Sequence, residues 1–160
     1  MIAPKQQSVN RTLYTIGYEG LDVPRFLKFL TCNKIRILVD VRELAFSRKR
    51  GFSKTALSEA LERMGIRYVH LSKLGSPRDL RHQLRDREDY PAFFDAYRQH
   101  LQGQEGAIDD LMTLIEEGCG VCLMCFEKEH EKCHRSLLAE FVSENCNGSI
   151  KVEPVKTWVK

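Results

Sequence analysis

Apolar residues along this chain recur with two different periods, and the two periods alternate. Residues 11–17 alternate between apolar and polar side chains, and residues 35–40 (IRILVD) form a nearly continuous aliphatic run. The first pattern is typical of a half-buried strand, and the second of a strand covered on both faces of a parallel sheet. Similar apolar runs at residues 66–71, 120–126 and 149–155 predict three further strands.

Between these strands, apolar residues recur every three to four positions, which predicts amphipathic helices. Asp22 and Ser53 stand where a side chain caps the first turn of a helix, and Gly65 stands where the second helix would end. Residues 78–89 are so polar that a solvated helix and a mobile segment both remain open. The other helices are expected after Pro91 and over residues 107–117 and 134–145.

This order of elements, with several helical segments before the fourth strand, predicts an α/β fold. The expected architecture is a three-layer sandwich with a largely parallel, Rossmann-like sheet of about five strands and helices on both faces. A chain of 160 residues is long enough to bury one such core. We expect the polar residues 1–10 to form a flexible N-terminal arm and residues 11–160 to form a single α/β domain.

Composition describes an ordinary soluble globular protein, with 42% hydrophobic and 29% charged residues. The formal net charge of +3 is too small to indicate nucleic acid by itself. No window is long and apolar enough for a membrane span, and the N-terminus lacks the apolar segment of a signal peptide. We therefore expect a cytoplasmic protein without a membrane partner, whose six cysteines are reduced thiols. Composition and net charge do not indicate the oligomeric state.

Polar side chains follow the expected strands directly, and these positions define the candidate site. In open parallel sheets, ligands bind where the carboxyl ends of the strands meet. The candidate ligand-binding residues are Tyr18, Glu19, Asp40, Arg42, Ser47, Arg48 and Arg135, and the candidate catalytic residues are Cys125, Glu127, Cys133 and His134.

Two cysteines in this set are candidates for thiol chemistry. Cys125 is expected at a strand exit and Cys133 at the start of a helix, where the helix dipole and unpaired N–H groups stabilise a thiolate. Either thiol can act as a nucleophile, with Glu127, Glu19 or His134 moving protons.

A metal ion is the alternative interpretation of the same residues. Zinc or iron held by Cys125, Cys133 and His134, with His130 as a further imidazole, remains open, although the spacing matches no common zinc template. Cys122 is expected to be a small buried core residue.

Two arginines are candidates for holding an anion. Arg42 and Arg135 are expected on neighbouring loops, where guanidinium groups can bind a phosphate bidentately. The alternative is that Arg42 pairs with Asp40 or Glu43 and merely orders its loop. The arginines of residues 78–89 are offset by acidic neighbours, so that segment is not expected to form a basic patch.

Four motifs, taken in order, carry a resemblance to a known family. They are TIGYEG (residues 15–20), VDVR (39–42), GIRY (65–68), and LMCFE (123–127) with CHR (133–135). Together they resemble the domain of unknown function 488 family, DUF488, over about residues 13 to 140. The resemblance implies an α/β fold but no reaction. It also implies a role for Tyr18, Asp40, Arg42, Cys125, Glu127, Cys133, His134 and Arg135.

The leading functional hypothesis is an enzyme whose pocket binds an anion, such as a phosphate of a nucleotide or nucleic acid, and uses Cys, Glu and Arg chemistry. One alternative is a non-catalytic module that binds nucleic acid or a partner protein through residues 48–50, and another is a metal-binding Cys/His protein. Residues 38–43 (LVDVRE) with Cys125 also look like the layout of rhodanese-type sulfurtransferases. That reaction is disfavoured because the loop after Cys125 lacks the glycines of a tight anion cradle.

Overall fold

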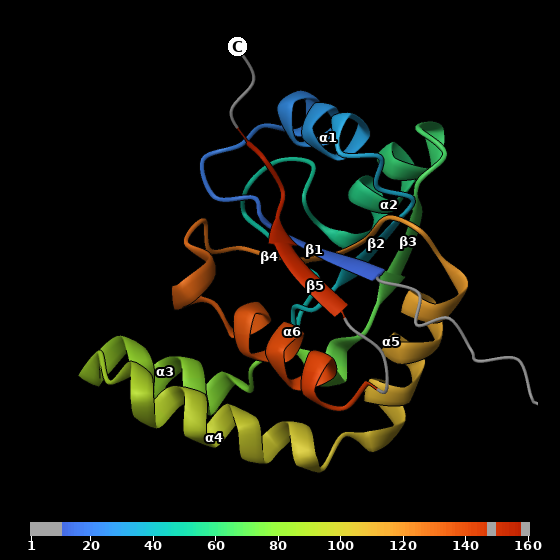
Figure 1. Ribbon diagram of the computed structural model, residues 1–160. Coiled ribbons are helices and arrows are strands. Elements are labelled where there is room, and N and C mark those ends of the chain that lie inside the picture. The colour runs from blue at the N-terminus through green and yellow to red at the C-terminus, as the bar shows by residue number, and fades with distance from the viewer. Residues whose placement is uncertain (1–10, 147–149, 158–160) are drawn as a thin grey trace, which may run out of the picture.

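A five-stranded, all-parallel sheet forms the centre of the structure, a computed structural model that describes residues 11–146 and 150–157 (Figure 1). The strand order is β3-β2-β4-β1-β5. The strands are β1 (Arg11–Gly17), β2 (Ile37–Asp40), β3 (Arg67–His70), β4 (Val121–Cys125) and β5 (Ile150–Pro154). The predicted three-layer α/β fold is confirmed. The arm expected for residues 1–10 lies outside the described residues.

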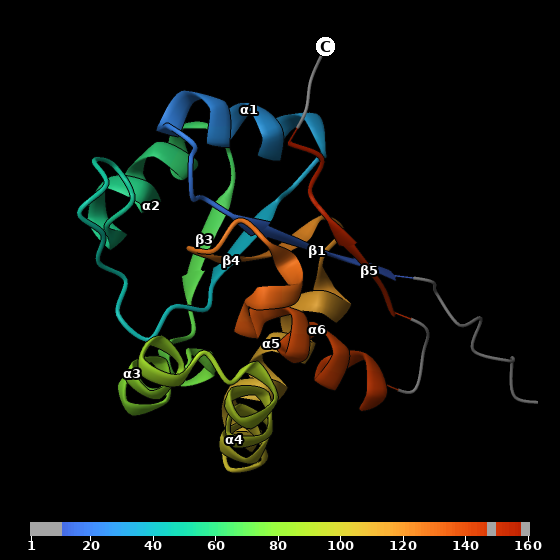
Figure 2. The same cartoon turned by 90° about the vertical axis from the view of Figure 1, so that its left-hand side faces the viewer.

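Helices cover both faces of this sheet (Figure 2). On one face lie α1 (Val23–Cys32) and α2 (Lys54–Arg63). On the other lie α4 (Tyr90–Gln102), α5 (Glu105–Glu117) and α6 (His134–Glu144), and α3 (Arg78–Arg87) packs against α4. The polar segment 78–89 therefore contains a helix, α3, which buries none of its own residues. Two short 3-10 helices, Ser72–Leu74 and His130–Lys132, complete the described elements.

None of the helices in these two described ranges is long and apolar enough to cross a membrane.

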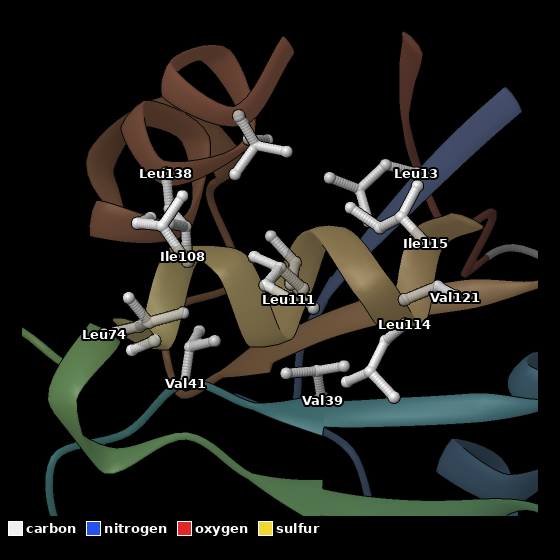
Figure 3. Packing of buried hydrophobic residues seen from close by; sticks show 14 of the residues in the cluster. Leu13, Val39, Val41, Leu74, Ile108, Leu111, Leu114, Ile115, Val121 and Leu138 are labelled. Atoms are coloured by element: carbon white, nitrogen blue, oxygen red, sulfur yellow. The ribbon is translucent and has the colours of Figure 1, made fainter. Parts of the chain in front are cut away.

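The two faces of β4 pack into separate apolar clusters. Cys122 points into the cluster under α1 and α2, whereas Leu123 and Cys125 point into the cluster under α5 and α6. Figure 3 shows Leu111 of α5 above the sheet residue Val39 in this second cluster. Cys122 is fully buried, which confirms its expected place in the core. The alternation of a strand thus separates Cys122 from Cys125 by the thickness of the sheet.

Capping residues begin α1 and α2 as expected, but only one of them caps through its side chain. The carboxylate of Asp22 accepts a hydrogen bond from the backbone N–H of Arg25 at 3.0 Å. Ser53 occupies the N-cap of α2, yet its hydroxyl accepts a hydrogen bond from the backbone N–H of Ser47 instead. Ser53 therefore closes the loop before α2.

The order of strands opens a crevice at their carboxyl ends. The chain leaves β1 and β2 towards one face and leaves β4, which lies between them, towards the other. Such a reversal is where parallel sheets bind ligands. Pairing continues past the strand ends, since the N–H of Tyr18 donates to the carbonyl of Cys125 and the N–H of Val41 to that of Met124. The three loops therefore start from fixed positions.

Gly17 allows the exit of β4 to lie directly against β1. A methyl group on Gly17 would overlap the backbone carbonyl oxygen of Glu127. We expect Gly17→Ala to lower the free energy of unfolding by about 2 kcal/mol or more, because backbone must shift to relieve the overlap. Denaturant unfolding followed by circular dichroism measures this loss.

Gly106→Ala is the matched control, because a methyl group there would meet no atom within 4 Å. Gly106 lies in the first turn of α5, where alanine is favoured by up to about 1 kcal/mol over glycine. Equal stabilities for the two variants would contradict the close approach at Gly17.

Candidate functional site

A cleft of about 600 Å³ opens at the carboxyl edge of the sheet. Residues after β1, β2 and β4 line one side, and α3, which lies beside the loop after β2, lines the other (Figure 2). Seven residues that the sequence predicted for the site line this cleft: Tyr18, Arg42, Ser47, Arg48, Cys125, Glu127 and His134.

The other four predicted residues lie outside the lining. Asp40 and Arg135 are buried and contact lining residues, and Cys133 is buried beside Cys125. Glu19 is exposed and lines a separate, smaller hollow next to Lys128. Arg135 lines that hollow too, so Glu19 lies outside the cleft but next to a residue of the site.

Asp40 and Arg42 form a buried ion pair at the floor of the cleft. Nε and Nη2 of Arg42 donate to the two carboxylate oxygens of Asp40 at 2.8 and 2.7 Å. Nη1 donates to the hydroxyl of Tyr18 at 3.2 Å and to the carbonyl of Phe52 at 2.8 Å. Four of the five guanidinium N–H groups are therefore engaged, which leaves one for a ligand. The pairing of Arg42 with Asp40, considered as an alternative from the sequence, is present.

Charge and burial fix the protonation of this pair and its neighbour. Burial lowers the pKa of Arg42, but the hydrogen bonds and charge of Asp40 outweigh burial and raise it overall. Tyr68 donates its hydroxyl to Asp40 at 2.5 Å, and burial together with the charge of Asp40 raises the pKa of Tyr68. The sequence analysis did not single out Tyr68, whose ring reaches the carboxylate from the neighbouring strand β3.

Beside this pair lies a compact group of four side chains, Cys125, Glu127, Cys133 and His134, which we call the thiol cluster. One donor atom from each lies within 4.8 Å of the others. The Sγ of Cys125 is 3.4 Å from a carboxylate oxygen of Glu127, and the Sγ of Cys133 is 3.6 Å from Nδ1 of His134. Burial raises the pKa of Glu127.

The two sulfur atoms of the cluster are in direct contact, as in a disulfide. The sequence analysis expected reduced thiols, and this contact contradicts that expectation for Cys125 and Cys133. The other four cysteines of the sequence are free, as expected. The Cα atoms of Cys125 and Cys133 are 7.7 Å apart, whereas disulfides span about 4.4–6.8 Å. The backbone therefore holds the two residues as neighbours at a separation wider than a disulfide uses.

His134 is held in one orientation and one tautomer. Its Nε2 lies 2.7 Å from the carbonyl oxygen of Val41, which can only accept, so we assign the proton to Nε2. The lone pair of Nδ1 then faces Cys133. Burial lowers the pKa of His134 to about 4, so the imidazole is neutral near pH 7.

Arg135 is a buried cation beneath the cluster, with only 1% of its surface exposed. Its Nη1 donates to the Sγ of Cys125 at 3.0 Å and to the carbonyl of Glu127 at 2.6 Å. It forms no ion pair with a carboxylate in the part of the chain that the structure describes, and its Nε is buried without a partner there. Burial lowers the pKa of Arg135, yet a guanidinium remains protonated in proteins. The charge of Glu127 opposes this lowering, and the sulfur of Cys125 is the atom of the cluster that Arg135 contacts.

The rim of the cleft contains residues that the sequence analysis did not select. Arg81 and Arg85 of α3 face the same space as Arg48, although the mixed charge of residues 78–89 argued against a basic patch. Arg81 pairs with Glu43 at 3.3 Å. The apolar part of the rim is exposed to an unusual degree, with exposed fractions of 66% for Leu44, 71% for Phe46 and 46% for Phe126. Only the fold brings these residues together, so no local pattern could have identified them.

The family model for the domain of unknown function DUF488 matches residues 22–142. The chain belongs to the DUF488 family. The match covers α1 through most of α6, and so includes Asp40, Arg42 and the whole thiol cluster. No curated protein and no solved structure matches the chain. Membership confirms the resemblance seen in the motifs and, as the family's description says, supplies no function.

The buried ion pair of Asp40 and Arg42 is expected to contribute to the stability of the fold. Asp40→Asn removes the negative partner of a buried guanidinium, so we expect the free energy of unfolding to fall by about 3 kcal/mol. Tyr68→Phe removes one hydrogen bond to the same carboxylate and should cost about 1.5 kcal/mol. Chemical denaturation of both variants measures these losses.

Asp22→Asn provides the control, since Asp22 is an exposed cap with an exposed ion pair to Arg25 and asparagine caps equally well. A loss at Asp40 no larger than the loss at Asp22 would contradict a structural role for the buried pair.

Proposed function

We propose that the cleft binds a ligand that carries both a phosphate and a nucleobase, namely a nucleotide or a short stretch of single-stranded nucleic acid. The observation that supports this proposal is the combination of guanidinium groups and exposed aromatic rings around one cleft at the carboxyl edge of the sheet.

The phosphate would bind to the arginines of the rim. Arg48 and Arg85 are exposed, and neither forms an ion pair within residues 11–146 and 150–157. Arg81, which also lines the cleft and is half-exposed, is only partly neutralised by Glu43. A guanidinium binds phosphate oxygens bidentately and is weakly hydrated, so arginine is the cation best suited to this contact.

The base would stack on the aromatic part of the rim. Phe46 exposes most of its surface to solvent and Phe126 exposes nearly half, although large apolar side chains are normally buried. Tyr18 supports Phe126 edge-on, with ring centroids 5.4 Å apart, and Tyr18 itself stacks on Phe52 at 4.6 Å. Stacking on an aromatic ring contributes about 1–3 kcal/mol per base and needs a base that is not already paired in a duplex.

An enzyme is favoured over a purely binding module because the thiol cluster opens to this same cleft. Cys125, Glu127 and His134 line its base, so a ligand bound at the rim extends towards them. Nucleophilic, acidic and imidazole groups collected at the base of a ligand cleft are the constellation expected of an active site.

Four arginine variants form two matched pairs that test the phosphate contact. Arg48 and Arg85 line the cleft, whereas Arg50 and Arg87, each two residues further along the chain, do not. We expect Arg48→Ala and Arg85→Ala to weaken binding of a fluorescein-labelled oligo-dT, and each to lower the slope of log K against log salt by about one. Arg50→Ala and Arg87→Ala should change the slope little. Equal effects in all four variants, or no binding at low salt, would contradict the proposal.

Phe46→Ala tests the base contact separately. We expect about tenfold weaker binding of oligo-dT, which corresponds to about 1.4 kcal/mol and lies within the range for one stacked base. Competition by inorganic phosphate should be unchanged, because phosphate has no ring to stack. Unlabelled adenosine monophosphate and unlabelled oligo-dT are then compared as competitors at equal phosphate concentration. If only adenosine monophosphate competes, the ligand is a nucleotide. The reverse identifies single-stranded nucleic acid. Retention of full oligonucleotide affinity in Phe46→Ala would remove the nucleobase from the proposal.

A further inference from the structure

We propose that Cys125, Cys133 and His134 bind a divalent metal ion, for which zinc is the best match, and that Glu127 completes the coordination from the side of the cleft. This inference does not depend on the identity of the ligand at the rim. It rests on the positions of the four donor atoms, the orientation of His134, the spacing of the two cysteines and the charge of Arg135.

Two of the separations between donor atoms match those of a tetrahedral shell. Ligands about 2.1–2.3 Å from zinc at tetrahedral angles lie about 3.4–3.8 Å from one another. The sulfur of Cys125 lies 3.4 Å from Glu127, and the sulfur of Cys133 lies 3.6 Å from Nδ1 of His134. All four donors lie within 4.8 Å of one another. The two sulfur atoms are in direct contact, so they must be reduced and move apart by side-chain rotation before a single ion can contact all four.

His134 is oriented as a metal ligand is. A ligating histidine usually donates its other ring N–H to a carbonyl or carboxylate, which fixes the tautomer and turns the free lone pair to the ion. Here Nε2–H donates to Val41 at 2.7 Å, and Nδ1 faces the sulfur of Cys133. A thiol is a weak hydrogen-bond donor, so an ion is the stronger partner for this lone pair.

The backbone spacing of the cysteines suits a shared ion better than a disulfide. Cys125 ends β4 and Cys133 precedes α6, and both positions are set by the strand and the helix rather than by a flexible loop. Their Cα separation of 7.7 Å is beyond the range of a disulfide. Two thiolates on one ion need no direct bond, and the ion occupies the extra distance.

With both cysteines reduced and ionised, a divalent cation would balance the charges of the cluster. Two thiolates and the Glu127 carboxylate carry three negative charges, and the ion with Arg135 carries three positive charges. Arg135 donates to the sulfur of Cys125, a contact that stabilises a thiolate ligand from outside the shell. Thiolates and an imidazole select zinc over calcium or magnesium, which prefer oxygen ligands.

Glu127 would occupy the coordination position of the ion that faces the cleft. Of the four donor residues, Cys125, Cys133 and His134 are buried and Glu127 is half-buried, and Glu127 lines the cleft together with Cys125 and His134. A zinc ion held by two cysteines and one histidine, with an exchangeable fourth position, is the catalytic rather than the closed structural type. An ion there can polarise a phosphate oxygen or a water molecule in the cleft.

Metal analysis of the intact chain tests the inference. The full-length protein, purified without chelator or histidine tag, should contain about one zinc ion per chain by inductively coupled plasma mass spectrometry. Cys133→Ser should lose most of this zinc, whereas Cys122→Ala, which removes an equally buried thiol from the opposite face of β4, should keep it. Zinc in equal amounts in both variants, or no zinc, iron or other transition metal in the wild-type chain even after incubation with zinc, overturns the proposal.

A second measurement on the wild-type chain guards against loss of folding in the variants. Replacement by Co²⁺ should produce the near-ultraviolet thiolate-to-cobalt band and the visible bands of tetrahedral cobalt. Peptide mapping after alkylation should show Cys125 and Cys133 protected until a chelator is added, with exposed Cys32 reactive throughout. The proposal is overturned if peptide mapping finds a Cys125–Cys133 disulfide that persists under cytoplasmic reducing conditions and prevents cobalt binding. It is also overturned if the chelator does not change the reactivity of the two cysteines.

Discussion

The positive charge of Arg135, buried beneath the end of β4, organises the carboxyl end of the sheet beside the cleft. Its guanidinium contacts the sulfur of Cys125 and the carbonyl groups of Glu127 and Lys128, so it holds the loop that leaves β4. A buried guanidinium without a negative partner is strongly unfavourable. Burial lowers the pKa of Arg135, and the charge of Glu127 opposes this effect by raising it. The same guanidinium therefore holds the loop after β4 and contacts the thiol cluster.

The arginines of the site belong to two classes that differ in what surrounds them. Arg42 and Arg135 are buried and spend their N–H groups on Asp40, on backbone carbonyls and on a sulfur atom. Arg48 and Arg85 are exposed at the rim. Arg42 lines the cleft and Arg135 lies beneath the thiol cluster, whereas Arg48 and Arg85 form no ion pair among the residues that the structure describes. The sequence hypothesis assigned anion binding to Arg42 and Arg135 because both follow strands, and strand position alone does not distinguish a structural guanidinium from a free one.

Much of the fold could be predicted from the sequence, because the periods of the apolar residues directly reflect burial. The aliphatic run of residues 35–40 ends in Asp40, and β2 ends at the same residue. Cys125 and Cys133 were placed at a strand exit and a helix start, which is where they lie. The rim was not predictable in this way. Arg85 lies on a helix whose charges are mixed in sequence, and its meeting with Phe46 depends on how α3 packs, which is a tertiary property. Tyr68 was missed for a similar reason, since its role depends on the neighbouring strand.

The thiol cluster links the chemistry of the site to the stability of the fold. Cys125 belongs to the central strand β4, whereas Cys133 and His134 begin α6, which covers one face of the sheet. His134 also hydrogen-bonds the segment after β2 through Val41. An ion or a ligand held by the cluster would therefore join β4, α6 and the exit of β2, the three elements whose divergence creates the cleft. Binding free energy that appears only in the folded chain adds to the stability of folding. The cleft and its chemistry would then be stabilised by the same contacts.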